Sequence, residues 1–539
     1  MRLAHSSNLN KIIISTITVN SHIVPCFLTS TLRFGDIQQY RNSAESGKKK
    51  AISAEFCCVC KKNIVPLQRK FKGNILMLIG RKNESQVLLE ALNADEAQFV
   101  AVYGRRRVGK TFLIRETLRD HFVFQHSGVA NSPKHIQLQA WQESLTEAGL
   151  PAEPLRNWMD AFAALKRLVK NSRKKKKVIF LDELPWMDTQ ASYFLPALEH
   201  FWNSWASARN DLMLVVCGSA TSWIIRKVIQ NHGGLHNRVT TKIHLRPFTL
   251  LECEEYTQYK HLNFTRKQIT EAYMIMGGVP YYWSCLQSSL SMAQNIDSLF
   301  FSPEGKLCDE YSALYASLYK QPANYIRVIE ALATKQTGLT RNEIISQTKL
   351  ADNGALTHIL QDLEYCGFIR QYHQISSRKN NAIFQLIDNY TIFYNHFVLR
   401  NKKNDPAFWS HSLNTPMHNV WCGLSFERVV LQHVAQIKQA LGISGVLTQE
   451  FAWKNQETQI DLLIDRQDDV VNLCEMKFYN DEIHDLANLN AELVRKREVF
   501  VRENNIKKAV YLTLISTFGV KTNNLMDIQN SVTIDQLFV

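Results

Sequence analysis

The stretch "QFVAVYGRRRVGKTFLIRETL", residues 98–118, decides the fold of the region around it. Its apolar opening predicts a buried strand, and a glycine-bounded loop and a helical pattern follow. Glycines let backbone N–H groups curl around phosphate oxygens, Lys110 can reach the β- and γ-phosphates, and Thr111 can bind Mg²⁺. Strand, loop and helix in this order predict a nucleotide-binding loop in an α/β fold.

The whole loop is expected to hold ATP. The residues assigned to nucleotide binding are Gly104, Arg105, Arg106, Arg107, Val108, Gly109, Lys110 and Thr111. The alternative is a glycine-rich turn with a chance lysine, which the strand-to-helix context disfavours.

Two further apolar runs end in polar residues that suit nucleotide hydrolysis. "KVIFLDELPW", residues 177–186, predicts a strand ending at Asp182, which can hold Mg²⁺ through water, while Glu183 can orient the attacking water. "LMLVVCGSATSW" predicts another, after which Ser219 either contacts the γ-phosphate or caps the strand. Arg238 either stabilises transition-state charge, in cis or from a neighbouring molecule, or is a surface arginine. The alternation of such runs with helix-length stretches predicts a parallel sheet.

Composition bounds the rest of the chain. Its 539 residues suggest three or four domains, and 45% hydrophobic with 21% charged residues is ordinary for a soluble globular protein. No run approaches the ~18 to 20 apolar residues of a membrane span, so no membrane partner is expected. The eleven cysteines, an odd and mostly scattered set, indicate a reducing compartment, and we expect a cytoplasmic protein.

The positive charge is concentrated near the N-terminus. Residues 1–76 hold twelve Lys/Arg and three Asp/Glu, which is +9 of the chain's net +14. We expect residues 1–74 to form a basic, disordered tail, with contact to nucleic acid or acidic lipid as the alternative. Met77 directly precedes the first stretch that looks ordered, so the first 76 residues need not belong to the working protein.

Five motifs in order, "LIGRKNE", "VYGRRRVGKT", "LDELPW", "LRPF" and "GGVPYYW", resemble those of the archaeal-type ATPase family. These are prokaryotic AAA+-like P-loop proteins related to signal-transducing (STAND-like) NTPases. The resemblance covers residues 78–283 and implies a helical lid after the P-loop core, which the pattern from Phe248 onward fits. Many members also carry a winged helix and a restriction-endonuclease-like C-terminal domain.

Residues 323–372 have the rhythm of a winged helix. The pattern predicts one helix, a second capped by Thr340 with Glu343 completing a capping box, and a third over residues 353–365. The third would enter a major groove, but it contains acids and no Lys or Arg, so its field repels phosphate. Only the wing tip, residues 376–381, is basic. The module is interpreted as a spacer or protein contact, with a DNA contact as the alternative.

The run "QIDLLIDRQDDVVNLCEMK", residues 459–477, predicts a hairpin. Pairing Asp461 with Glu475 leaves a five-residue loop and places both acids and Lys477 on one face, with apolar residues on the other. Facing carboxylates repel each other, and a divalent cation relieves that repulsion. Upstream, residues 421–441 form an amphipathic helix that carries an acid, Glu427, in its first turns.

This order, a Glu on a helix, an Asp on a strand and a Glu-x-Lys strand, resembles the PD-(D/E)xK restriction-endonuclease-like nucleases. The resemblance implies Glu427, Asp461 and Glu475 as Mg²⁺ ligands and Lys477 as a catalytic residue that positions water or offsets charge on the phosphate. Ile460 replaces the family's proline. The alternatives are a structural ion pair in a hairpin, and a fold that binds nucleic acid without cutting it.

These patterns predict an α/β protein with an additional, smaller α/β domain. Its expected parts are a basic tail (1–74), a P-loop ATPase core (75–247), a helical lid (248–321), a winged helix (322–388) and a nuclease-like domain (389–539). The expected function is Mg²⁺-dependent ATP hydrolysis coupled to a domain that cuts or binds nucleic acid. The alternative is an ATP-dependent switch that regulates a protein partner or a homo-oligomer, with a non-catalytic C-terminal domain.

Overall fold

The structure, a computed structural model, describes the backbone of two strands near the N-terminus and most of the chain after Met77, namely residues 78–231, 233–319, 321–372, 382–521 and 525–539. Residues 1–77 and 78–539 are two compact units. In the first, β1 (Ile13–Val19) and β2 (His22–Leu28) pair antiparallel. The predicted tail included no strands, and their β-branched residues favour them. The rest of residues 1–77 and the wing tip lie outside the described residues.

A five-stranded parallel sheet forms the centre of the ATPase region, in the order β4-β5-β6-β3-β7. The strands are β3 (Gln98–Tyr103), β4 (Phe122–Ser127), β5 (Lys177–Asp182), β6 (Leu212–Gly218) and β7 (Thr241–His244). The sequence predicted β3, β5 and β6. It missed β4 and β7, because these edge strands mix polar with apolar residues and lack the continuous apolar run of a central strand.

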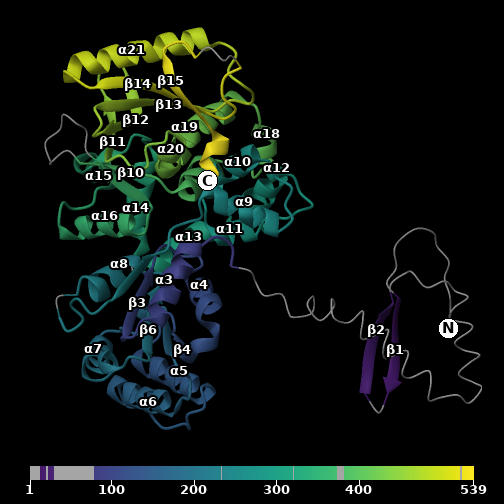
Figure 1. The fold of residues 1–539 in the computed structure, drawn as a ribbon, viewed down its shortest axis with the longest axis vertical. Helices are drawn as coiled ribbons and strands as arrows, with labels where there is room; N and C mark the ends of the chain where they lie inside the picture. The colour runs from purple at the N-terminus through teal and green to yellow at the C-terminus, as the bar shows by residue number, and fades with distance from the viewer. Residues whose placement is uncertain are drawn as a thin grey trace, which may run out of the picture. The chain divides into compact units, whose positions relative to one another are not determined.

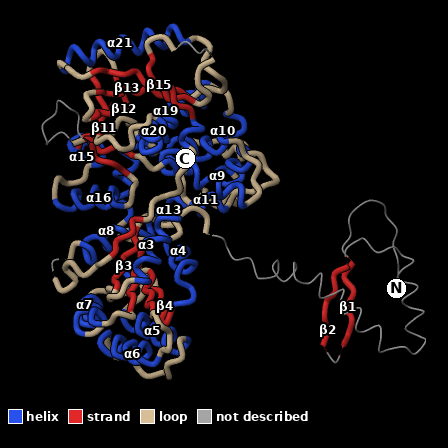
Figure 2. The backbone as a smooth tube through the Cα atoms, in the orientation of Figure 1, coloured by secondary structure: helices blue, strands red, loops and turns tan. Residues whose placement is uncertain are grey.

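Helices cover both faces of this sheet, which makes three layers (Figure 1, Figure 2). On one face, α3 (Lys82–Asn93) and α4 (Lys110–Leu118) share a core with Val100 and Val102. On the other face, the alternate residues Phe99 and Ala101 pack in a core with α5 (Lys134–Glu147), α6 (Trp158–Asn171) and α7 (Phe194–Ser204). The predicted parallel α/β sheet is confirmed.

The segment after this sheet is helical, as predicted for residues 248–321. It contains α9 (Leu250–Tyr259), α10 (Arg266–Met276), α11 (Pro280–Ser284), α12 (Met292–Ile296), the π-helical η5 (Asp297–Phe301) and α13 (Glu310–Leu318). Its helices bury a large apolar core that continues into the parts of the chain that follow.

Residues 322–388 contain the predicted three helices and two following strands, together with a short strand, β8, that was not predicted. They form α14 (Pro322–Ala333), β8 (Leu339–Thr340), α15 (Arg341–Thr348), α16 (Gly354–Tyr365), β9 (Ile369–Tyr372) and β10 (Ile383–Leu386). The capping box of Thr340 and Glu343 is present at α15. The acidic α16 packs on α8 (Thr221–Ile224), and its Asp362 forms an ion pair with Arg226 at 2.7 Å. This helix therefore contacts the protein's own ATPase region.

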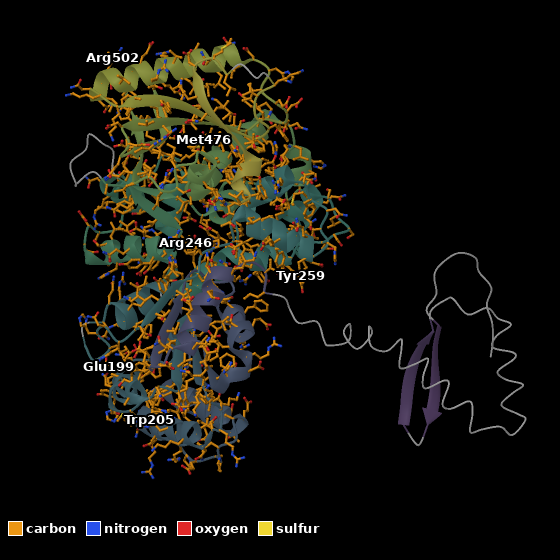
Figure 3. The ribbon with its side chains drawn as sticks, in the orientation of Figure 1. Glu199, Trp205, Arg246, Tyr259, Met476 and Arg502 are labelled. Carbon is orange, nitrogen blue, oxygen red and sulfur yellow. The ribbon has the colours of Figure 1, made fainter. Side chains whose placement is uncertain are left out.

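The C-terminal part is a second five-stranded sheet, in the order β11-β12-β13-β14-β15. Strands β11 (Thr448–Lys454), β12 (Gln459–Arg466) and β13 (Val470–Lys477) are antiparallel, and β14 (Ala509–Ser516) and β15 (Ile528–Thr533) continue in parallel. Helix α21 (Leu486–Asn504) covers one face, and Figure 3 marks the two layers with Met476 on β13 and Arg502 on α21.

The hairpin register is as predicted, with Leu462 opposite Cys474. The apolar residues of that face join the large core with α19 (Pro416–Gln432) and α20 (Val434–Ala440). The predicted helix over residues 421–441 was wrong in its bounds. Helix α19 begins at Pro416, so Glu427 lies in its second half. The helix ends at Gln432, and His433 separates it from α20.

One apolar core joins these C-terminal parts, since it runs from Phe248 to Phe538. The buried His433 is a polar contact within it: Leu250 N–H donates to its Nε2 at 3.1 Å, and its Nδ1 pairs with the Val429 carbonyl at 2.7 Å. Burial lowers the pKa of His433 to about 4. Within the compact unit 78–539, the domain boundaries drawn from the sequence stay predictions. No helix in the described part of the chain is long and apolar enough to cross a bilayer.

Candidate functional site

Two glycines set the shape of the loop between β3 and α4. Gly104 has a φ of 144°, and a Cβ there would lie 2.2 Å from the carbonyl oxygen of Leu245, so only glycine fits. Gly109 has a φ of 91° and caps the N-terminus of α4. The loop thus delivers backbone N–H groups to the positive end of a helix, the arrangement that binds phosphate.

Lys110 begins α4 and is only 6% exposed. Its Nζ donates to the carbonyl oxygens of Gly104 at 2.8 Å and Arg105 at 3.0 Å. Burial lowers the pKa of Lys110. The ammonium is therefore folded back over the loop, at the place where the phosphates of a nucleotide would meet it.

Thr111 and Asp182 come together as predicted. Thr111 Oγ1 donates to Asp182 Oδ2 at 2.8 Å, across the gap between the start of α4 and the end of β5. Their hydroxyl and carboxylate oxygens are ligands that suit Mg²⁺. The pair fits a magnesium ion held against a nucleotide.

Sequence reasoning missed one partner of this pair. The Sγ–H of Cys217 donates to Asp182 Oδ1 at 2.6 Å. The pairing of β5 with β6 runs in register up to Leu181 opposite Val216, so the next residues on the two strands are Asp182 and Cys217. The contact between Cys217 and Asp182 could have been predicted if β5 and β6 had been recognised as neighbouring strands.

Glu183 and Ser219 form the other polar contact at this edge of the sheet. Glu183 has a φ of 47°, the left-handed region, which turns the chain sharply after β5. Its carboxylate accepts Ser219 Oγ–H at 2.6 Å and Ser219 N–H at 3.1 Å. Both predicted residues thus lie at one site, and Ser219 holds the acid that is expected to orient water. Arg238 is exposed on the loop before β7, and its predicted role stays a prediction.

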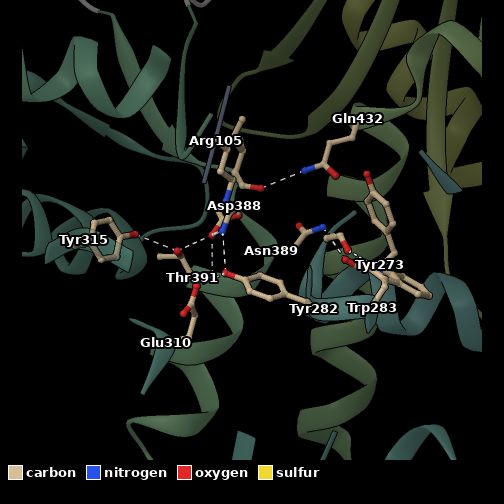
Figure 4. A network of polar contacts seen from close by, with 12 residues as sticks. Arg105, Tyr273, Tyr282, Trp283, Glu310, Tyr315, Asp388, Asn389, Thr391 and Gln432 are labelled. Carbon is tan, nitrogen blue, oxygen red and sulfur yellow. Dashed lines mark hydrogen bonds and ion pairs between the residues drawn. The ribbon is translucent and has the colours of Figure 1, made fainter. Parts of the chain in front are cut away.

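The side chain of Arg105 leaves the loop and enters the C-terminal half of the protein (Figure 4). It is 5% exposed, its two terminal nitrogens contact both oxygens of Asp388, and Nη2 lies 3.5 Å from the hydroxyl of Tyr282. Burial opposes the guanidinium charge, but Asp388 outweighs it, so the net pKa of Arg105 is raised. Asp388 also accepts the N–H of Thr391 as the N-cap of α17 (Asn389–Phe393).

Arg107 makes a second contact of this kind. Its Nη2 lies 2.8 Å from Glu310 Oε2 on α13, and its guanidinium carbon lies 4.0 Å from the ring centre of Tyr281. Glu310 also accepts the Tyr282 hydroxyl at 3.3 Å. The side chains of Arg105 and Arg107 therefore contact acids of later segments rather than the loop they leave, and their backbone N–H groups are what they can offer to phosphate.

The other two loop residues have different surroundings. Val108 is buried, and its carbonyl accepts Arg81 Nη2 at 3.4 Å. Arg106 is half-buried. Burial raises the pKa of Glu310, and the charges of Arg107 and Arg106 partly offset that rise. Contact of either residue with a nucleotide stays a prediction.

The predicted C-terminal acids are near one another but are not arranged as a ready metal site. Glu475 Oε1 accepts from Lys477 at 2.9 Å, and Oε2 accepts from Lys496 on α21 at 2.7 Å. Asp461 Oδ1 accepts from Gln459 at 2.6 Å. Among the described residues, no group of three or more His, Cys, Asp or Glu is placed to hold a metal ion. A Mg²⁺ site made by the three carboxylates of Glu427, Asp461 and Glu475 stays a prediction.

The pKa of Glu427 reflects its burial and the charges of the neighbouring acids Asp461 and Glu475. Burial raises its pKa to about 8, and the negative charges of Asp461 and Glu475 add to the effect. Glu427 and Asp461 line the same cavity. Sequence reasoning missed Lys496, which lies on a separate helix and gives no local pattern.

The parallel sheet, the glycine-bounded loop and the Lys110, Thr111 and Asp182 contacts define a P-loop nucleotide-binding protein. Residues 78–286 match the family described as "ATPase domain predominantly from Archaea". An uncharacterized ATP-binding protein of Methanocaldococcus jannaschii is 44% identical over 46 residues, 8% of this chain and 78% of that protein. The chain belongs to this ATPase family through residues 78–286.

Longer matches were also found. An uncharacterized protein of Methanocaldococcus jannaschii is 22% identical over 430 residues, which cover 78% of this chain and 92% of that protein. Among solved structures, a Walker-type ATPase of Pyrococcus abyssi matches with a TM-score of 0.43 and 14% identity, over 59% of this chain and 96% of that one.

Proposed function

We propose that the protein is a Mg²⁺-dependent ATPase whose nucleotide state is coupled to a C-terminal domain that cuts or binds nucleic acid. The observation that carries the ATPase part is the contact between Thr111 and Asp182 beside Lys110. Thr111 and Asp182 would hold Mg²⁺, which neutralises charge on the phosphates when bound. Glu183, placed by Ser219, would orient the attacking water.

The ATPase proposal is tested with two substitutions. Lys110→Ala removes the cation that reaches the phosphates and is expected to abolish ATP binding. Glu183→Gln keeps binding but slows turnover, since an amide polarises water less well than a carboxylate. Binding is measured with a fluorescent ATP analogue and turnover by phosphate release. Lys170→Ala, on the last turn of α6, serves as a control for loss of a lysine. Parent-like hydrolysis by both variants would refute the proposal.

The nucleic-acid part is supported by the hairpin register, in which Leu462 lies opposite Cys474, and by the ion pair between Lys477 and Glu475. Mg²⁺ bound to these acids would compete with Lys477 and Lys496 for Glu475. Mg²⁺ is therefore expected to raise the melting temperature of the parent by mass action, and Asp461→Ala to remove that rise. Lys477→Ala should keep it but lose strand cleavage. A flat Mg²⁺ response in Lys110→Ala, where the nucleotide site is disabled, would count against a C-terminal metal.

A second candidate is an ATP-dependent switch that acts on a protein partner or on another copy of this chain. It is favoured by the ion pairs that join the loop to Asp388 and Glu310, and by the docking of the acidic α16 on Arg226. Under this alternative the C-terminal domain is structural, and nucleic acid of every form fails to bind. We place either activity in the cytoplasm, in line with the odd number of scattered cysteines.

A further inference from the structure

A cavity of about 580 Å³ lies between residues 322–388 and the C-terminal domain. One wall comes from the turn before β8 and from strands β9 and β10, and the other from α19, β11 and β12. Gln336 donates to the Leu424 carbonyl across this junction at 3.4 Å. The cavity exists because two segments far apart in sequence pack together.

Charged side chains of both signs line the cavity. Glu427 and Asp461, two of the acids predicted for the nuclease-like site, lie on one side with Arg428 and Lys454. Lys335, Arg370 and Glu343 lie on the other side, where Lys335 Nζ pairs with Glu343 Oε1 at 2.8 Å. Arg370 is held on β9 by a bond from its Nε to Gln385 Oε1 at 2.7 Å. No carboxylate in the described part of the chain lies within ion-pair distance of Arg370. A half-buried guanidinium placed in this way can take two oxygens of a phosphate.

We propose that this cavity binds a single nucleic-acid strand, with Arg370 and Lys335 holding its phosphates opposite Glu427 and Asp461. The inference rests on the proposed nucleic-acid role of the C-terminal domain. Four cationic and three anionic side chains line the cavity, so its net charge favours a polyanion. Tyr372, also in the lining, has the guanidinium carbon of Arg370 5.4 Å from its ring centre, and an aromatic ring is a surface on which a base can stack.

Size and surroundings select one strand over a duplex. The volume falls in the roughly 300–1,000 Å³ range of pockets for small ligands, which admits a nucleotide or two and not a double helix. The helix that would enter a major groove, α16, is occupied by its contact with Arg226. The segment that resembles a winged helix therefore contributes its sheet, rather than its third helix, to the nucleic-acid site.

Fluorescence anisotropy of the full chain tests the proposal. The probes are labelled oligo(dT), labelled oligo(U) and a duplex DNA of the same length, in Ca²⁺ to limit cleavage, with free dTMP as competitor. The parent is expected to bind a strand more tightly than the duplex. Arg370→Ala should weaken strand binding about tenfold, as for loss of a charged hydrogen bond. Lys335→Ala should weaken it severalfold, and the exposed Arg400→Ala, outside the cavity, should leave it unchanged.

Melting curves and ATP hydrolysis check that the variants fold, and the partly exposed Lys335 carries the test if Arg370→Ala does not. Tighter binding of duplex than of strand, or full competition by dTMP at equal concentration, would overturn the inference. Parent-like strand binding by both cavity variants, together with loss of cleavage in Lys477→Ala, would overturn the inference alone and leave the proposed function standing. No binding of any nucleic acid by the parent would overturn both.

Discussion

Replacing Asp388 with asparagine should destabilise the protein, because the Arg105 guanidinium would stay buried without its counter-ion. Both residues are 5% exposed, and Arg105 contacts both carboxylate oxygens. Removing one partner of a buried ion pair costs about 3–5 kcal/mol. Asparagine still caps a helix, so Asp388→Asn keeps the cap of α17 and removes only the charge. Asp388→Ala removes the cap as well and should cost ~1 kcal/mol more.

This cost can be expressed as a change in melting temperature. Unfolding entropy is about 2.1 cal/mol/K per residue, so the unit from Leu78 to Val539 has an entropy near ~1 kcal/mol/K if it unfolds as a whole. Asp388→Asn should then lower the melting temperature by about 3–5 °C in calorimetry. The control is Asp535→Asn, which breaks an ion pair of an exposed acid and should shift it by about 1 °C or less.

A double variant separates the ion pair from other effects. Arg105→Met with Asp388→Leu replaces the pair by apolar groups, which is often neutral, so it should melt above Asp388→Asn. Asp388→Asn melting within about 1 °C of the parent would refute the buried pair. A double variant as unstable as the two single changes added together would show that the residues are not coupled.

Three other changes test separate parts of the structure. Gly104→Ala should lower stability and abolish ATP binding, because its Cβ would overlap a backbone carbonyl, whereas Gly445→Ala meets no atom within 4 Å and should do neither, in melts and ATP titrations. Burial lowers the pKa of His433 from 6.5 to about 4, so the unfolded chain binds more protons between these values, and stability falls as the pH drops through this window. In His433→Gln, the loss of stability that this titration causes between pH 6.5 and about 4 should be absent from melting curves. A variant with the same pH dependence of the melting temperature as the parent would contradict this role of His433. A chain beginning at Met77 should bind ATP as the full chain does and melt at the same temperature, while a large drop would show that residues 1–76 stabilise the remainder.

Local sequence patterns were sufficient for the elements that carry the chemistry. The strand, loop and helix around Lys110 and the strand ending at Asp182 each depend on neighbouring residues, so a short window predicts them. The pairing of β12 with β13 followed for the same reason, because alternation and loop length together allow one register. The edge strands β4 and β7 were missed, since half-exposed strands do not give a continuous apolar signal.

Contacts between distant segments could not be predicted in this way. Arg105 and Asp388 are 283 positions apart, and nothing near either residue indicates the other. Lys496 reaches Glu475 from a helix whose placement depends on the packed sheet. For the same reason the pairing of Glu475 with Lys496 was not predicted: the spacing of acids fixes their strand faces, but their side-chain partners come from elsewhere in the fold.

These distant contacts connect the nucleotide loop to the proposed nucleic-acid cavity. Asp388 follows β10 by two residues, and Ile383 and Gln385 of β10 line the cavity. A movement of the loop that pulls on Arg105 would therefore act on one wall of the cavity through a short, packed segment. Spatial continuity alone is not coupling, because a ligand shifts a conformation only by its difference in affinity for two states. The decisive measurement is the affinity for a nucleic-acid strand in the presence of ATP and of ADP, made on the parent and on Asp388→Asn. If the affinity differs between the two nucleotides in the parent but not in the variant, the coupling passes through this ion pair. Equal affinities in the parent would show that the contact serves only stability.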